Sequence, residues 1–569
     1  PNTPPQPPAY RNRARNPNPQ AQLAQQPQGE DLVTPKTALK PMAAVLCAAL
    51  SLAACASVSS PADTTQNLEC LSVSAFEPSP SLLPSVATST DTVKLAQLLF
   101  SSLVYWDEKG QIHNDIATSI TPSADCRDFR IQIQPDLKYS DGTALTADNF
   151  AESWSAAAQN GSVLNTLNRS GNTVGAAVSQ LFAPIVGFGT EVGVRQGLEV
   201  HSTTDFTVHL QVPTCDFAQR LGHPAFAPLP IQAFSSEGEY KARFGETPYG
   251  YGPYMLAREG AWERSARLTL VPNERYRGPR RVLNEGLVFE FGASGEGQRL
   301  IDGQLSIDDG LPTGLSHRKA PLDRNYAQWV STRLQVLVLP DLGALSLSGD
   351  REEEGRLRRA AISGAIDRVA LCHSVLAGHC QVLPDFPRGI WDPATVMKTQ
   401  VNAKTELMVN LEQVQQWWKH AQDLEPWQGT LVLAAGGEGQ KAWMTEVAKT
   451  LRRVLGIDVQ VKQYLTVRAA QNDAAAGEMV AYSLGLRPLY PGPGALLVPL
   501  FGATYDGSAR GEDAATETET LAGLNVPQIR ETLGKAQATA DRAKATQLYY
   551  QAAQQVEQSV AVVPLWNLA

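Results

Sequence analysis

Short strand-like segments alternate with amphipathic helical segments from residue 70 to the end of the 569-residue chain, and this mixture constrains the fold most strongly. Residues 71–76 and 129–134 place apolar side chains at every second position, as a strand with one buried face does. Residues 92–103 place them at helical spacing, with Thr90 or Asp91 as the N-cap. A chain of this length exceeds one hydrophobic core, so the sequence predicts two or more α/β lobes.

The most informative stretch runs from residue 139 to residue 150, Tyr-Ser-Asp-Gly-Thr-Ala-Leu-Thr-Ala-Asp-Asn-Phe. Asp141 and Gly142 favour a tight turn, and Thr146 is placed to begin a helix. Phe150 and Trp154 lie four residues apart, so they should pack together on the buried face of that helix. The stretch predicts a strand, a turn and a capped helix, and its residues require no catalytic role.

The charge of the chain argues against a nucleic-acid partner. The net charge is −9, whereas phosphate binding needs a clustered positive field. Two short basic runs, Arg280-Arg281 and Arg358-Arg359, have no aromatic residues interleaved with them. We interpret both runs as solvated faces.

The N-terminal region predicts export. Residues 1–40 are rich in Pro, Asn and Gln and should be disordered; one hypothesis is that translation starts near Val33. An apolar run follows, too short for a spanning helix, and with its preceding lysines it suits a signal peptide in residues 41–55. Its end, Leu-Ala-Ala-Cys55, resembles the lipobox of bacterial lipoproteins, which implies lipidation of Cys55 and a polar tether in residues 56–69. The alternative is a buried core helix that happens to end in cysteine.

The cysteines fit an exported protein. Cys372 and Cys380 lie close enough to close a short disulfide loop, and among Cys70, Cys126 and Cys215 one further pair is possible, which would leave one thiol free. Histidines beside Cys372 and Cys380 leave a zinc site as the alternative, but their spacing matches no usual ligand pattern.

The stretch at residues 139–150 closely resembles the F-S-D-G-T-P-L-T-A-E-D-F segment of the family 5 extracellular solute-binding proteins, the peptide- and nickel-binding group. Further matches follow in the family's order, and they lie at residues 81–84, 103–107, 249–256, 270–278, 300–308, 357–368, 455–459 and 563–566. Each match alone is weak, but their order makes chance implausible.

This resemblance implies a two-lobed clamp like that of periplasmic binding proteins, of type II and the large peptide-binding subclass, with mixed α/β sheets. Residues 70–335 plus 556–569 would form lobe I, and residues 336–555 would form lobe II. The implied function is substrate capture for an ABC importer by lobe closure, on the outer face of the plasma membrane. Its partners would be a peptide-like small molecule, permease subunits and the membrane through the N-terminal lipid; the protein would act as a monomer.

The resemblance also implies the ligand site. The positions that pair with a peptide main chain correspond to Thr88, Ser89 and Thr90, and the alternative is a polar loop that caps the next helix. The second-lobe segment corresponds to Ser483, Leu484, Gly485, Leu486 and Arg487, where relatives carry an aspartate for the free amine of the peptide. No carboxylate is present here, and Arg487 falls at or beside that position, so we expect an anionic or N-blocked ligand. Alternatively, Arg487 points to solvent or pairs structurally.

Two other classes of function are weaker. The segment Thr430–Ala442 carries G-x-G-x-x-A after a strand, but the next strand lacks the acidic residue of a dinucleotide site. No hydrolase elbow or metalloprotease motif is present, so we expect no enzyme activity, no cofactor and no metal. A clamp that serves as an envelope sensor or scaffold stays open as the alternative function, because fold does not fix function.

Overall fold

The computed structural model describes residues 70–78, 81–87, 90–167, 178–190, 192–235, 240–258, 260–292, 299, 302–307, 334–375, 380–382, 409–436, 438–502 and 523–568. All of them belong to one compact unit, Ala54–Ala569. Below, the N-terminal part means the described residues up to 307, and the C-terminal part means those from 334 onward. The predicted signal, lipidation and tether segments lie outside the described residues.

A five-stranded sheet opens the N-terminal part. Its order is β1 (Cys70–Ala75), β11 (Gly286–Phe291), β10 (Arg267–Pro272) and β8 (Tyr254–Leu256), with β9 (Trp262–Glu263) beside β10. β1 runs parallel to β11, and the other pairs are antiparallel. The helix α2 (Thr90–Leu99) packs on this sheet through Leu95 and Leu99. The helix predicted over residues 92–103 therefore exists but ends earlier, because the chain turns into β2 (Val104–Trp106).

A four-stranded antiparallel sheet forms the second layer of the N-terminal part. Its order is β4 (Ala117–Pro122), β5 (Asp128–Ile133), β7 (Asp205–His209) and β6 (Leu198–Ser202). β5 alternates exposed and buried residues, as its sequence predicts. α3 (Ala147–Leu167) packs on the buried face, where the rings of Phe150 and Trp154 meet edge to face at 5.9 Å. β2 pairs with β3 (Ile112–Asn114) in a separate hairpin.

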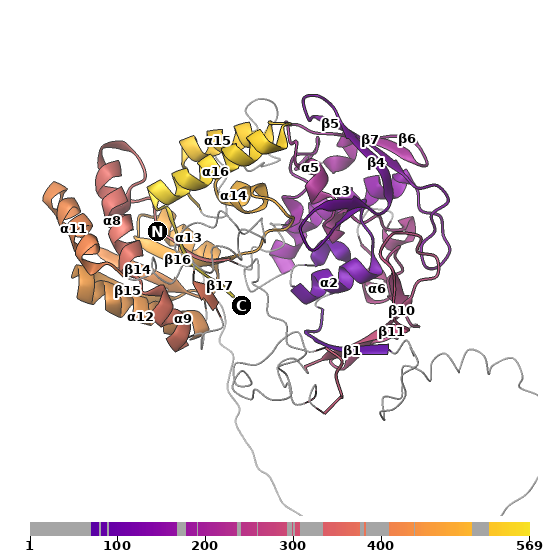
Figure 1. The fold of residues 1–569 in the computed structure, drawn as a ribbon, viewed down its shortest axis with the longest axis horizontal. Coiled ribbons are helices and arrows are strands. Elements are labelled where there is room, and N and C mark those ends of the chain that lie inside the picture. The colour runs from indigo at the N-terminus through magenta and orange to yellow at the C-terminus, as the bar shows by residue number, and fades with distance from the viewer. Residues whose placement is uncertain are drawn as a thin grey trace, which may run out of the picture. The chain divides into compact units, whose positions relative to one another are not determined.

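The C-terminal part is built on a six-stranded sheet. Its order is β13 (Cys380–Val382), β17 (Val562–Leu568), β12 (Leu334–Val338), β16 (Val480–Leu486), β14 (Thr430–Ala435) and β15 (Asp458–Gln463). β12 alternates between two cores, since Val336 and Val338 face one and Leu337 faces the other. α8 (Glu352–Ala365), α9 (Arg368–Val375), α11 (Leu411–Leu424) and α12 (Glu438–Leu455) cover one face. α13 (Val467–Ala475), α14 (Gly494–Phe501), α15 (Pro527–Gln537) and α16 (Arg542–Ser559) cover the other (Figure 1).

Short helices connect these elements. They are η1 (Pro84–Val86), η2 (Gly193–Gly197), α5 (Phe217–Arg220), η3 (Pro224–Phe226), η4 (Ile231–Ala233), α6 (Ala242–Glu246), η5 (Gly343–Leu345) and η6 (Gly349–Arg351).

The C-terminal strand does not return to the sheets of the N-terminal part, contrary to the prediction that residues 556–569 join lobe I. β17 pairs antiparallel with β12 on one side and with β13 on the other. Val562 to Asn567 are all buried, so the strand is covered on both faces. An apolar strand gains most from such a central position, because both faces leave water.

The basic run Arg358-Arg359 is not a solvated face, which corrects the sequence interpretation. Arg358 is 0% exposed and pairs with Glu354 at 2.9 Å, and its guanidinium lies 5.0 Å from the ring centre of Trp418. Arg359 is 1% exposed and donates to backbone carbonyls. Arg280 is also engaged, in an ion pair with Asp115 at 3.0 Å, whereas Arg281 is exposed as expected.

Candidate ligand-binding site

The first predicted set of binding residues is only partly described. Thr88 and Ser89 lie outside the described residues, as does Cys55. Thr90 is the first residue of α2, and its side chain is also outside the description. What the structure does give is α2 itself, whose Lys94 lies one helical turn after Thr90.

The second predicted set lies at the end of β16. Ser483 is 4% exposed; its hydroxyl donates to the carbonyl oxygen of Val336 at 3.1 Å and accepts a hydrogen bond from the amide of Gln335. The side chains of Leu484 and Leu486 are buried in the C-terminal core. Ser483 therefore links β16 to the neighbouring strand β12, and Leu484 and Leu486 pack in the core. Gly485 is exposed, and the side chain of Arg487 is partly buried.

Arg487 lies within electrostatic reach of two residues of the N-terminal part. Burial lowers the pKa of Lys94 and nearby Asp91 raises it, while the charge of Arg487 lowers it again. Burial lowers the pKa of His223 to about 3, and Arg487 contributes in the same direction. The structure thus brings together side chains from α2, from the residues before η3 and from the end of β16. We call Lys94, His223 and Arg487 the basic group.

His223 contributes a neutral imidazole to the basic group. It is 2% exposed, and with a pKa near 3 it carries no charge at neutral pH. Its Nδ1 accepts a hydrogen bond from the backbone N–H of Ala225 at 3.1 Å. The remaining proton therefore resides on Nε2, which makes this nitrogen a donor. The positive charge of the basic group comes from Arg487 and Lys94.

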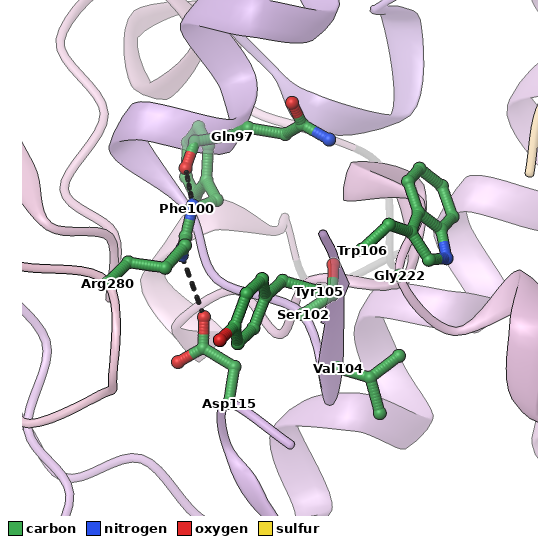
Figure 2. A pocket seen from close by; sticks show the side chains of 9 residues that line it. All are labelled: Gln97, Phe100, Ser102, Val104, Tyr105, Trp106, Asp115, Gly222 and Arg280. Atoms are coloured by element: carbon green, nitrogen blue, oxygen red, sulfur yellow. Dashed lines mark hydrogen bonds and ion pairs between the residues drawn. The ribbon is translucent and has the colours of Figure 1, made fainter. Parts of the chain in front are cut away.

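A pocket of about 90 Å³ adjoins the same elements (Figure 2). Gln97 of α2, Phe100 directly after α2, Tyr105 and Trp106 of β2, and Gly222 contribute to its wall. Gln97 lies three residues after Lys94, and Gly222 directly precedes His223. A side chain at position 222 would collide with Trp106, since an added Cβ would lie 2.6 Å from the indole. Glycine is therefore needed here for the close approach of Trp106.

A buried ion pair closes one side of this pocket. Arg280 Nε donates to Asp115 Oδ2 at 3.0 Å, and the hydroxyl of Tyr276 donates to Asp115 Oδ1 at 3.0 Å. Arg280 also donates to the Gln97 carbonyl (Figure 2) and to the Ser101 hydroxyl, so its guanidinium is held on three sides. Burial raises the pKa of Asp115, although Arg280 and Tyr276 act against that rise. Such a fixed pair gives the pocket a rigid polar wall.

Sequence reasoning missed Lys94, His223, Asp115 and Arg280. Lys94 follows Thr90 by four residues on a predicted helix, so the helical period could have placed it on the same face. His223, Asp115 and Arg280 carry no local signal, because their partners lie far away in the sequence. The arrangement can hold an anionic group near Arg487 and Lys94 and a small side chain in the neighbouring pocket.

Two disulfides are described. Cys372 and Cys380 are bonded, as their spacing predicts, and Cys126 is bonded to Cys215. Cys70 is also disulfide-bonded, so the free thiol expected among Cys70, Cys126 and Cys215 is not found. Within the described ranges no cluster of His, Cys, Asp or Glu has a metal-binding arrangement. None of the described helices combines the length and apolar character needed to cross a bilayer.

Comparison with known proteins gives a family match over most of the chain. The model of the bacterial extracellular solute-binding proteins, family 5 Middle, matches residues 111–508. The "Dipeptide-binding protein" of Lactococcus lactis is 22% identical over 370 residues, which cover 63% of this chain and 65% of that protein. The "Probable D,D-dipeptide-binding periplasmic protein DdpA" of Escherichia coli is 25% identical over 308 residues, 52% of each chain. The matched region thus spans less than two thirds of either relative.

A solved structure extends the likeness to the fold. The Escherichia coli murein tripeptide binding protein MppA superposes with a TM-score of 0.60 at 18% identity, covering 89% of this chain and 93% of that one. At this level of identity the likeness establishes the fold alone. The predicted fold class, that of a periplasmic peptide-binding protein with mixed α/β sheets, is confirmed.

Proposed function

The chain belongs to the bacterial extracellular solute-binding proteins of family 5, and from this premise we propose that it captures a peptide-like small molecule for an ABC importer. Members of this family are binding proteins rather than enzymes. The relatives named for binding a dipeptide and a D,D-dipeptide support a short peptide as the ligand class. Permease subunits of the importer are the proposed partners, and the protein works as a monomer.

Capture proceeds by closure of two lobes. The first lobe holds the two sheets of the N-terminal part, and the second holds the six-stranded sheet. A ligand that touches both lobes only in the closed arrangement stabilises that arrangement by its differential contacts. Arg487 of the C-terminal part affects the pKa of Lys94 and of His223 in the N-terminal part, which supports a ligand that meets both parts.

The ligand is anionic or N-blocked at the end that meets Arg487. The observation that carries this proposal is the electrostatic reach of Arg487 to Lys94 and His223. The segment Val480–Ala495 contains no Asp or Glu, so it offers no carboxylate to a free ammonium. An ammonium buried beside Arg487 would cost several kcal/mol, whereas a carboxylate would accept hydrogen bonds from the planar guanidinium.

Calorimetric titration with N-acetyl-dialanine and with unblocked dialanine tests the proposal. The acetylated peptide keeps the carboxylate and lacks the ammonium, so we expect it to bind more tightly. Arg487→Ala should weaken its binding by about 10- to 100-fold, the worth of a charge-assisted hydrogen bond. Arg487→Lys should recover part of this loss, because it restores the charge without the planar fork.

Arg453→Ala is the matched control, because Arg453 is exposed on α12 and its loss changes the net charge equally. We expect the control to bind like the parent protein. Tighter binding of unblocked dialanine, or equal affinity of the parent and Arg487→Ala, would contradict the proposed ligand chemistry.

The proposed location is the outer face of the plasma membrane, with lipid on Cys55. The mass of the protein from a membrane fraction should exceed the polypeptide mass by the lipid, and Cys55→Ser should remove both the added mass and the partition into detergent. A thiol that carries lipid cannot also form a disulfide, so the same mass measurement shows whether Cys55 is free for lipid. An unmodified Cys55 in a bacterial membrane preparation would contradict the proposed lipid modification.

A further inference from the structure

A buried contact joins the two parts of the chain at Asp216, outside the pocket of Figure 2. The hydroxyl of Tyr490 donates to Asp216 Oδ2 at 3.4 Å, and the hydroxyl of Tyr549 donates to the same oxygen at 3.3 Å. Arg220 Nη2 lies 3.5 Å from Asp216 Oδ1, and its guanidinium lies 5.2 Å from the ring centre of Tyr490. We call Asp216, Arg220, Tyr490 and Tyr549 the anchor.

The two tyrosines and Arg220 of the anchor are buried and Asp216 is partly buried, but the hydrogen bonds between them are long. Tyr490 and Tyr549 are 6% and 4% exposed, and burial raises the pKa of both, so both hydroxyls stay protonated donors. Hydrogen bonds between hydroxyl and carboxylate oxygens are usually 2.5–3.0 Å long, so the two distances here are long. A cavity of about 670 Å³ borders Asp216 and Tyr549. The contact therefore has room to tighten.

Two chain segments carry residues of both the anchor and the basic group. Tyr490 follows Arg487 by three residues, and Arg220 precedes His223 by three. Cys215, next to Asp216, donates its backbone N–H to the Gln537 carbonyl at 2.8 Å. A movement of one part against the other must therefore change the anchor and the basic group together.

We propose that Asp216 is a positioning residue whose bonds to Tyr490 and Tyr549 shorten when the two parts close on a ligand. This inference rests on the proposed function, since it assumes capture by closure. The anchor does not touch the ligand; it adds stability to the closed arrangement. Loss of the anchor lowers the population of that arrangement, and the apparent affinity falls by the same factor.

Gly494 allows a test that removes no polar group. It is the first residue of α14, and a Cβ built on it would lie 2.8 Å from both Asp216 Oδ2 and the Tyr549 hydroxyl. Gly494→Ala therefore pushes the anchor apart. The matched control is Gly534→Ala in α15, where an added Cβ meets no atom within 4 Å.

Removal of the hydroxyls gives a second test. Tyr490→Phe and Tyr549→Phe each remove one bond of the anchor. Tyr254→Phe is the control, because its hydroxyl donates to Asn284 Oδ1 at 3.0 Å within the N-terminal part. All three lose a partly buried hydroxyl contact, so a general loss of stability affects them alike.

Two measurements are made on each variant: the Kd for N-acetyl-dialanine, well below the unfolding temperature, and hydrogen exchange of the ligand-free protein. The anchor variants should bind about two- to tenfold more weakly, as expected for one hydrogen bond, and the two controls should bind like the parent. Exchange should quicken in residues 214–221 and 489–497 together in the anchor variants only.

Parental Kd values and exchange rates in Gly494→Ala, Tyr490→Phe and Tyr549→Phe would overturn the role of Asp216. If the parent binds no tested peptide, the proposed ligand class fails, and hydrogen exchange alone then decides the anchor. Faster exchange in both segments supports it, and faster exchange in one segment alone overturns it.

Discussion

Replacing Arg359 by methionine should destabilise the C-terminal part far more than the same replacement at Arg356 on the same helix. Arg359 Nε donates to the Ser559 carbonyl at 2.7 Å, and Nη1 donates to the carbonyls of Leu345 at 2.6 Å and of Ser346. The side chain thus ties α8 to residues 345–346, shortly before the helix, and to distant Ser559. Burial lowers the pKa of Arg359 to about 10, so the guanidinium stays charged at neutral pH.

The magnitude follows from the acceptors that would lose their donor. Each buried carbonyl left without a hydrogen bond costs about 1–3 kcal/mol, so the buried carbonyl of Leu345 and the two partly buried carbonyls together cost about 3–6 kcal/mol. The methionine side chain fills much of the volume, which keeps the cavity contribution small. Arg356, by contrast, pairs with exposed Glu353 at 2.6 Å, and its loss should cost about 0.2–1 kcal/mol.

Urea unfolding followed by tryptophan fluorescence measures both losses. The midpoint of the transition that includes the C-terminal part should fall strongly for Arg359→Met and slightly for Arg356→Met, with little change in slope. Similar losses for the two variants would refute the reasoning, because they would mean that the buried carbonyls find water or other donors without Arg359.

Three further predictions follow from other contacts. Burial lowers the pKa of His223 from its ordinary 6.5 to about 3, so between these pH values the imidazole is protonated in the unfolded chain but not in the folded one. The free energy of unfolding should therefore fall by up to about 4–5 kcal/mol as the pH drops from 6.5 to 3. His223→Asn should flatten this part of the curve of stability against pH. Removing the Cys126–Cys215 disulfide, whose cysteines are 89 residues apart, should lower the free energy of unfolding in urea by about 4–5 kcal/mol. Removing Cys372–Cys380, with a separation of 8, should lower it by about 2–3 kcal/mol. Equal losses would contradict the chain-entropy argument. Burial and Arg487 lower the pKa of Lys94, and an anionic ligand should raise it again. Calorimetric titration of N-acetyl-dialanine in two alkaline buffers of different ionisation enthalpy should therefore show proton uptake on binding. Lys94→Met should remove this uptake.

The local structure of the chain could be predicted from the sequence, because its determinants lie within a few residues of each other. The alternation in residues 129–134 gives β5, and Thr146, Phe150 and Trp154 give the start and the buried face of α3. The backbone N–H of Thr146 also donates a hydrogen bond to Asn149 Oδ1 at 2.8 Å, as in a capping box. Each of these features needs only helical or strand periodicity and capping chemistry.

Strand pairing and the burial of charge could not be predicted, because they depend on residues far apart in the sequence. The apolar run of β17 is typical of a central strand, but it does not indicate which strands will be its neighbours. Its partner β12 lies more than two hundred residues earlier in the sequence. From the sequence alone, Arg359 is expected at the surface, because the carbonyl acceptors at Ser559 and Leu345 that permit its burial appear only in the structure. Arg487 could be selected from its segment, whereas the effect of Arg487 on His223 depends on tertiary structure.

The candidate site and the anchor share two chain segments, so affinity alone cannot separate recognition from closure. In the proposed site Arg487 and Lys94 would act on the ligand through charge, and an interaction between partly exposed charges weakens as salt screens it. The anchor would act through partly buried hydrogen bonds to neutral hydroxyls, which salt screens little. Affinity of Arg487→Ala for N-acetyl-dialanine should therefore lose much of its salt dependence, while Tyr549→Phe should keep the parental salt slope with a constant offset. A parental slope in both variants would mean that Arg487 does not meet the ligand's charge.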